Sequence, residues 1–188
     1  MDMVKKRKKA SSSIGYVFLF LTAMLLVIIT MYMMQVAKIM THQHHVDDSL
    51  ASAVLGSLVA DDTYYFESYE TTGTPVIRFR SVDESFYIFS DCMYDAVNET
   101  VDYYYNFSLD TYICYEVAGS NVTVTTYSRN GGIKSVTSGR VGVVRAPTGE
   151  VVRDTSAYGK VRFDIKSILD GSYITKTKDI YCTLEVNE

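Results

Sequence analysis

The longest apolar run of the chain extends from Ile14 to Met34 and contains no charged side chain. A hydrocarbon core about 30 Å thick requires roughly 20 apolar residues in helical conformation, and this run has that length. In lipid, a single segment satisfies its backbone polar groups by closing its own helical hydrogen bonds. A core helix of a soluble domain would carry a polar stripe, which this run lacks. The pattern therefore predicts a transmembrane helix at residues 14–34.

Beyond the span, apolar and small residues recur at alternating steps of three and four, which places them on one face of a helix. The stripe consists of Val36, Ile39, Gln43, Val46, Leu50, Ala53 and Ser57, and is widened by Met40, Val54 and Leu58. One helix is therefore expected from about Ile14 to Ala60, amphipathic in its second half. Asp61 and Asp62 mark its expected end, so residues 35–62 are interpreted as a helical extension of the span.

The beginning of the segment 63–188 predicts a connector, a strand and a helix. Tyr64–Thr74 has the composition of a polar, aromatic connector, and Val76–Arg80 alternates as a short half-buried strand. Ser81 and Glu84 fit a capping box, in which the serine caps a helix and the glutamate reaches back. Apolar residues at helical spacing follow, so an amphipathic helix is expected from Val82 to about Asn98.

Short β-rich runs fill most of the remainder of the chain. They are Tyr112–Val117, Val122–Tyr127, Ile133–Thr137, Arg140–Val144, Val161–Ile165 and Ile180–Val186. Asn130-Gly131-Gly132 suits a tight hairpin between the second and third runs. The predicted fold class is therefore α+β: a long N-terminal helix, transmembrane and then amphipathic, with a small antiparallel β domain of five to seven strands that carries one further helix.

The charged residues beside the span predict its orientation. Five basic side chains directly precede it, namely Lys5, Lys6, Arg7, Lys8 and Lys9, and only Lys38 follows it closely. Because basic flanking segments stay preferentially in the cytoplasm, residues 1–13 are predicted to be a cytoplasmic tail of a single-pass protein of the cell membrane. The extension 35–62 and the α+β domain 63–188 are then extracytoplasmic.

A cleaved secretory signal is the alternative to a membrane anchor. The apolar region of such a signal is about 7–15 residues long and ends at a small-residue site. Here the apolar run is longer, and the nearest triplet of small residues, Ala51-Ser52-Ala53, lies far downstream. The sequence therefore favours an uncleaved anchor.

Charge restricts the class of partner. The chain has 188 residues and a net charge of −4, while residues 1–13 carry +4, so residues 14–188 carry −8. This acidic balance argues against nucleic acid or an anionic lipid surface as the partner of the outer domain. The chain has sixteen tyrosines, fourteen of them after the span, and no tryptophan, so the outer domain is tyrosine-rich, which suits both half-buried strand positions and contact surfaces.

Cysteines and histidines are the candidate chemical groups. Cys114 and Cys182 lie in strand-like runs and could form a disulfide, whereas a reduced set of three cysteines that includes Cys92 is an equal alternative. His42 and His45 are three residues apart and Asp48 follows after three more, a spacing that could serve a metal or pH-sensing group. The alternative is a polar collar just above the lipid headgroups.

Motifs of enzymes and cofactor sites are absent from the sequence. It contains no Gly-x-Ser-x-Gly elbow, no His-Glu-x-x-His, no phosphate-binding glycine loop and no paired-cysteine zinc motif. All three histidines lie close to the span, so the β domain holds no Ser-His-Asp arrangement. We therefore expect no enzymatic activity, no cofactor, no metal and no small-molecule substrate.

The chain resembles the TadE/TadF-like pseudopilins of tight-adherence (Flp, type IV) pilus systems, in their Gram-positive form. The resemblance rests on the basic residues 5–9, the run from Gly15 to Met34 and the segment Val46–Val54, with a general likeness at Ala146–Gly149 and Thr155–Tyr158. Such pilins carry a Gly or Ala cleavage position followed about five residues later by Glu. Here the residue five positions after Gly15 is Phe20, and the residue five positions after Ala10 is Gly15, so neither candidate cleavage position has the glutamate. The anchor is therefore predicted to be retained.

Two functional hypotheses follow. The resemblance implies a structural, pseudopilin-like component of a pilus or related secretion machine, whose partners are the lipid bilayer and other pilin-like or pilus-machine membrane proteins. The alternative is a bitopic envelope protein whose outer β domain binds an extracellular partner. The candidate helix contact is Val46, Leu50, Ala51, Ser52, Ala53 and Val54. Its broad face is expected to cover the β domain and its narrow edge to meet a partner, with the small residues Ala51, Ser52, Ala53 and Gly56 allowing close helix approach.

Overall fold

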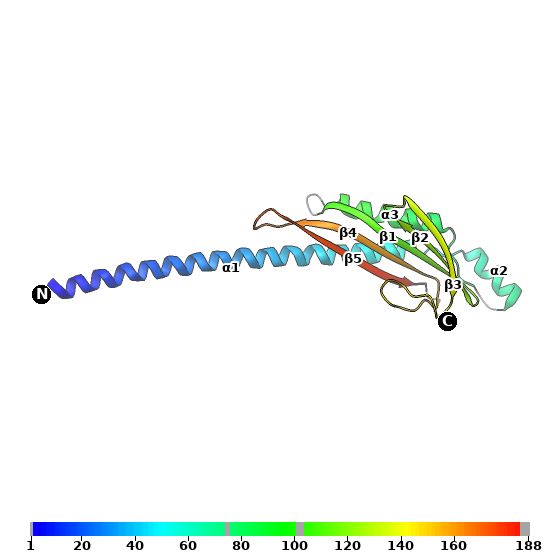
Figure 1. Cartoon of the computed structure of the whole chain (residues 1–188), viewed down its shortest axis with the longest axis horizontal. Helices are drawn as coiled ribbons and strands as arrows, with labels where there is room; N and C mark the ends of the chain where they lie inside the picture. Colours follow the sequence, from blue (N-terminus) through cyan, green and yellow to red (C-terminus); the bar gives the residue numbers. More distant parts are fainter. Residues whose placement is uncertain (1, 74–75, 101–103, 185–188) are drawn as a thin grey trace.

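The computed structural model describes residues 2–73, 76–100 and 104–184, with side chains from residue 14 onward. It contains three helices in this part of the chain, which are α1 (Asp2–Ser57), α2 (Asp62–Thr72) and α3 (Val82–Asn98). The five strands are β1 (Tyr105–Ala118), β2 (Asn121–Ser128), β3 (Ile133–Arg140), β4 (Ser156–Lys166) and β5 (Tyr173–Thr183). A long helix projects from a small domain, and the predicted α+β class is confirmed (Figure 1).

Helix α1 is continuous from the apolar run into the domain. Its 56 residues correspond to about 80 Å at a rise of 1.5 Å per residue. The helix begins at Asp2, so the predicted tail has a helical backbone, although the side chains of the basic cluster 5–9 lie outside the described part. It ends at Ser57, slightly before the predicted Ala60.

All strand pairs of the sheet are antiparallel, and the strand order is β3-β2-β1-β4-β5. The predicted hairpin between β2 and β3 is present, with Arg129, Asn130 and Gly131 in the left-handed region. The predicted strand at Arg140–Val144 is wrong. Residues 141–143 form a turn in which Val143 N and Val144 N both donate to Arg140 O, and this turn opens the connection 141–155 from β3 to β4.

Two further predictions fail around Asp61. Tyr64–Thr74 is not a connector, because the Asp61 carboxylate accepts from Tyr64 N at 3.1 Å and caps α2. Val76–Arg80 does not form a regular strand. Arg80 N donates to Val59 O, and Asp61 N donates to Arg78 O, each at 3.0 Å. The partner segment, residues 59–61, ends where α2 begins at Asp62, so it is too short for a regular strand pair.

The sheet has a different cover on each face. Helix α1 lies against β4 and β5, and α3 lies against β1, so both helices share one face (Figure 1). The connection 141–155 packs on the opposite face, where Ala146 and Val152 contact a cluster formed by Ile113, Tyr115, Val122 and Tyr158. The domain therefore has one large core beneath the helices and a smaller one beneath this connection.

Helix α3 begins as its sequence predicts. Ser81 has extended backbone geometry, and its hydroxyl accepts a hydrogen bond from Glu84 N at 3.2 Å. Phe86, Phe89 and Met93 are buried at helical spacing beneath this helix. The capping residue and the amphipathic face are both confirmed.

In the described part of the chain, Cys92, Cys114 and Cys182 are all free. Cys114 of β1 pairs in register with Ala157 of β4, which in turn pairs with Cys182 of β5. The two cysteines are therefore separated by an intervening strand, which places them about 9–10 Å apart. This separation is too large for a disulfide, so the reduced alternative holds in this structure.

Candidate helix-contact surface

The broad face of α1 covers the protein's own sheet. Val46 and Leu50 are 2% and 1% exposed, and Ala53 and Val54 are fully buried. Four of the six predicted contact residues are thus part of the core of the domain. Their burial matches the expectation that the broad face covers the β domain, and it leaves Ala51 and Ser52 as the candidates for a partner.

Close approach between the helix layer and the sheet depends on Gly159 of β4. A Cβ atom at this position would lie 2.7 Å from Val54 Cγ2 and 2.9 Å from Phe89 Cε2. Both distances are shorter than ordinary carbon–carbon contacts, so a larger residue would displace the side chains of Val54 and Phe89. Gly159 therefore lets α1 and α3 approach the same strand.

A buried hydroxyl cluster fastens the end of α1. Tyr112 Oη lies 2.6 Å from Ser57 Oγ and 2.6 Å from Ser85 Oγ. Ser57 Oγ also donates to Val54 O, and Ser85 Oγ donates to Ser57 O. Burial raises the pKa of Tyr112, so its hydroxyl stays protonated. The cluster ties α1, α3 and β1 together and has a structural role.

The opposite edge of α1 is not covered by the domain. Ala51 is half-buried, Ser52 is exposed, and Leu55 is 56% exposed one turn further along. Met40, nearer the span, is 54% exposed. Between Met40 and Leu55 this edge carries the small side chains of Ala51 and Ser52, and small residues permit close packing of a second helix.

A groove of about 350 Å³ separates this edge of α1 from α3. Its lining residues are mostly small, and they are His45, Asp48, Ser49, Ser52, Ala53, Cys92 and Ala96. The sequence analysis missed the contribution of α3, namely Cys92 and Ala96. Their spacing of four residues places both on one face of that helix, and this was the available signal.

The histidines do not assemble a metal site. His42 Nδ1 donates to Lys38 O at 2.6 Å, and His45 Nδ1 lies 2.6 Å from the Tyr104 hydroxyl. Asp48 is exposed and lines the α1–α3 groove with His45, whereas His42 is buried. Among the described residues, no group of three His, Cys, Asp or Glu side chains could hold a metal ion.

His42 replaces a predicted member of the buried stripe. Gln43 was expected in that stripe, but it is half-buried, whereas His42 is only 3% exposed. Burial lowers the pKa of His42 below its ordinary value of 6.5, and the positive charge of Lys38 and the neighbouring His45 act in the same direction, against the opposing effect of the Lys38 carbonyl. His42 is therefore a buried, neutral histidine packed edge-on against Tyr104.

We predict that the domain loses stability as the pH falls through the ordinary pKa of histidine. The unfolded chain binds a proton at His42 near pH 6.5, while the folded chain binds it only at lower pH, so acid favours unfolding. Replacing His42 with glutamine removes this proton uptake. Urea unfolding measured from about pH 8 to about pH 5 should show a smaller loss of stability in His42→Gln than in the unmodified protein.

His44 provides the control for this experiment because it is exposed on the same helix. His44→Gln should keep the pH dependence of the unmodified protein. An unchanged pH dependence in His42→Gln would contradict the prediction.

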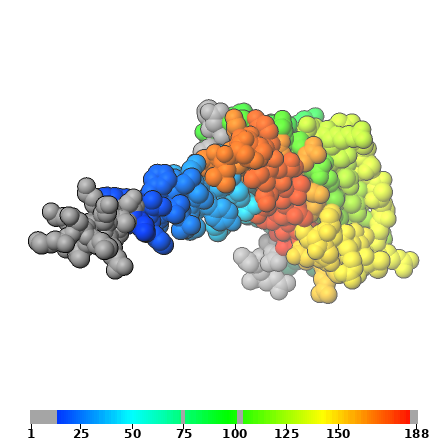
Figure 2. Space-filling model, turned by 60° about the vertical axis from the view of Figure 1, so that its left-hand side comes forward, coloured from blue at the N-terminus to red at the C-terminus, as the bar shows by residue number. Residues whose placement is uncertain are grey.

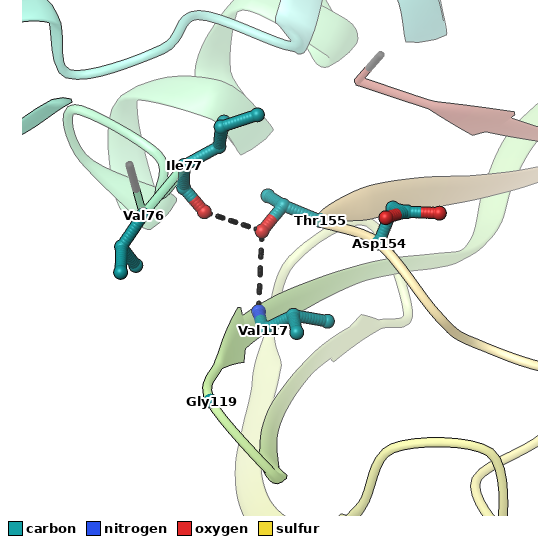
Figure 3. Close-up of a pocket in the computed structure, with 6 residues that line it drawn as sticks. All are labelled: Val76, Ile77, Val117, Gly119, Asp154 and Thr155. Atoms are coloured by element: carbon teal, nitrogen blue, oxygen red, sulfur yellow. Dashed lines mark hydrogen bonds between the residues drawn. The ribbon is translucent and has the colours of Figure 1, made fainter. Parts of the chain in front are cut away.

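A small cavity lies beside the end of β1, between this strand and the segments before α3 and β4. It has a volume of about 160 Å³ and is lined by Val76, Ile77, Val117, Gly119, Asp154 and Thr155 (Figure 3). Thr155 Oγ1 donates to Ile77 O at 2.5 Å and accepts from Val117 N at 3.1 Å. The threonine thus fastens the segment before α3 to the sheet, and among the described lining residues Asp154 is the one that titrates.

Comparison with protein-family models, with curated proteins and with solved structures finds no match to this chain. The described residues combine a membrane-span candidate that continues into an α+β domain with a groove on the helix layer of that domain.

Proposed function

We propose that this chain is a structural, pseudopilin-like component of a type IV/Tad pilus or related secretion machine. The difference in burial between the two halves of α1 supports this proposal. Every residue from 14 to 34 is exposed, and the second half of the same helix is buried on one face only. This arrangement suits a helix that passes from lipid into a helix–helix assembly while its domain faces outward.

The basic residues 5–9 support an orientation with the N-terminus in the cytoplasm and the α+β domain outside. In this orientation, the edge at Ala51 and Ser52 lies on the extracytoplasmic side of the membrane, where partner helices of the same assembly would run. The proposed partners are therefore other pilin-like or pilus-machine membrane proteins.

Ser52→Arg tests the proposal. Arginine at this exposed position would fill the α1–α3 groove and place a charge in the proposed contact without disturbing the buried face. We expect a folded, membrane-integrated protein whose recovery with pilus-machine proteins falls about tenfold or more, which corresponds to about 1.4 kcal/mol of binding free energy. Co-purification from native membranes, with quantitative mass spectrometry, measures this effect.

Ser120→Arg is the matched control because Ser120 is exposed on the turn between β1 and β2. The control should co-purify as the unmodified protein does. If Ser52→Arg also assembles normally, the edge of α1 is not the contact surface and the proposal fails.

The alternative, an envelope protein whose β domain binds an extracellular partner, is favoured by one observation. Strand β3 forms an edge of the sheet, and its Ile133 and Val136 are 45% and 60% exposed. An exposed edge strand can add a strand from a partner. Val136→Lys would weaken such pairing, so loss of partners in this variant, with normal assembly of Ser52→Arg, supports the alternative.

A further inference from the structure

The turn between β4 and β5 contacts α1 at the end of the apolar run. Ile168 N donates to Gln35 Oε1 at 2.6 Å, and Gln35 is the first residue after the run. One helical turn later, Lys38 Nζ donates to Lys166 O at 3.2 Å. Figures 1 and 2 show this turn, in orange, beside the helix and nearer to the N-terminus than the other end of the sheet. The turn is therefore level with the boundary of the membrane span.

Hydrogen bonds within the turn hold it in one shape. Ser167 N donates to Ser172 O at 2.8 Å, and Gly171 N donates to Ser167 O at 3.2 Å. The carboxylate of Asp170 accepts from both the backbone N and the hydroxyl of Ser172, at 3.1 and 2.8 Å. Gly171 has a φ of +70°, which glycine adopts without strain.

This ordered turn presents apolar side chains outward. Ile168 is 47% exposed, Leu169 is 51% exposed and Tyr173, at the start of β5, is 52% exposed. Full burial of a side chain of the size of Ile or Leu is worth about 1.5–3 kcal/mol, so these residues gain free energy by leaving water. Tyrosine is enriched at membrane–water interfaces, where its ring and hydroxyl both find a suitable environment.

The charges around the turn fit the headgroup layer of a bilayer. Lys166 is exposed and Lys38 lies beside it, and both side chains can extend their ammonium groups toward lipid phosphates. Asp170 is the acidic residue of the turn, and its hydrogen bonds with Ser167 and Ser172 lower its pKa. The Asp170 carboxylate is thus hydrogen-bonded to groups of the turn itself.

We infer that the β4–β5 turn is a second membrane contact, which inserts Ile168 and Leu169 into the interfacial layer of the leaflet on the C-terminal side of the span. Lipid is the occupant because the turn contacts α1 at Gln35, directly after residues 14–34, all of which are exposed. With two contacts, the domain is held at a fixed angle to the bilayer. This inference rests on the membrane anchoring in the proposed function.

The absence of tryptophan from the chain gives a direct test. Three full-length variants each receive one tryptophan: Leu169→Trp in the turn, Met24→Trp in the middle of the apolar run, and Val143→Trp in the connection 141–155. Val143 is the control because it is 72% exposed and belongs to the connection at the other end of the sheet (Figure 1). Each is reconstituted into vesicles of phosphatidylcholine and phosphatidylglycerol, with or without bromine on the acyl chains.

We expect blue-shifted emission and strong quenching by brominated lipid for Met24→Trp, and water-like, unquenched emission for Val143→Trp. Leu169→Trp should be quenched several-fold more than Val143→Trp, most strongly by bromine close to the headgroup. If Met24→Trp is quenched and Leu169→Trp is not, the inference is overturned while the anchor stands. If Met24→Trp is not quenched, both the anchor and the inference fail.

Discussion

Replacing Phe89 with alanine should lower the free energy of unfolding by about 3–5 kcal/mol. Phe89 is fully buried in α3 and stacks on Tyr112 with ring centroids 4.5 Å apart. The ring also lies directly above Gly159, so its removal leaves a cavity between α3, β1 and β4. Gly159 has no side chain, so this position of the sheet cannot fill the cavity.

Urea unfolding of the full chain in detergent micelles, followed by the near-ultraviolet circular dichroism of the tyrosines, measures the effect. Tyr87→Ala is the matched control because Tyr87 lies on the same helix and is 63% exposed. Its cost should stay within about 0.5 kcal/mol. If Phe89→Ala lost as little stability as Tyr87→Ala, the packing of α3 on the sheet would contribute little to the stability of the domain, and the prediction would be wrong.

The elements with a strong local signal were predicted from the sequence. The apolar run of α1 and its continuation follow from periodicity, and Ser81 predicted the start of α3 through its capping chemistry. The order of the strands has no comparable signal, because β1 pairs with β4 although β2, β3 and the connection 141–155 separate them in the chain. The β-rich runs were also predicted too short, since β1 begins at Tyr105 and includes polar residues such as Asn106 and Asp110.

The errors have identifiable physical causes. Asp61 was interpreted as the end of a helix, whereas its carboxylate caps the next one and pairs with Arg78 at 2.9 Å. A single polar side chain can serve either role, and the choice depends on where the chain turns. In α1, helical spacing alone could not decide whether His42 or Gln43 faces the sheet, because adjacent residues differ by only about 100° around a helix.

The candidate site was predicted in part. The small size of residues such as Ala51 and Ser52 suggested a contact edge on α1, which stays a prediction, and nothing in the sequence joined Ser52 to Ala96 of α3 in one groove. The contact between Gln35 and Ile168 joins residues that are 133 positions apart, and neither residue type signals the other. Sites built from two distant elements depend on tertiary packing, which local patterns do not encode.

The second large effect is expected in the candidate membrane span, residues 14–34. Replacing Leu25 and Ile28 together with aspartate should prevent stable integration into the membrane. Each aspartate near the centre of a transmembrane helix costs about 2.5–3.5 kcal/mol, while the leucine or isoleucine that it replaces contributes about −0.3 to −0.6 kcal/mol. Alkaline carbonate extraction of membranes measures the outcome, and the variant should be released into the soluble fraction.

The arrangement of the chain makes this effect decisive, because the described residues contain one helix long and apolar enough to cross a membrane. No neighbouring span is available there to pair with the new carboxylates. Thr41→Asp with His44→Asp is the matched control, since both positions are exposed on the same helix beyond the apolar run, and it should remain in the membrane fraction. Retention of the Leu25→Asp, Ile28→Asp protein as an integral membrane protein would show that residues 14–34 are not the segment that holds it there.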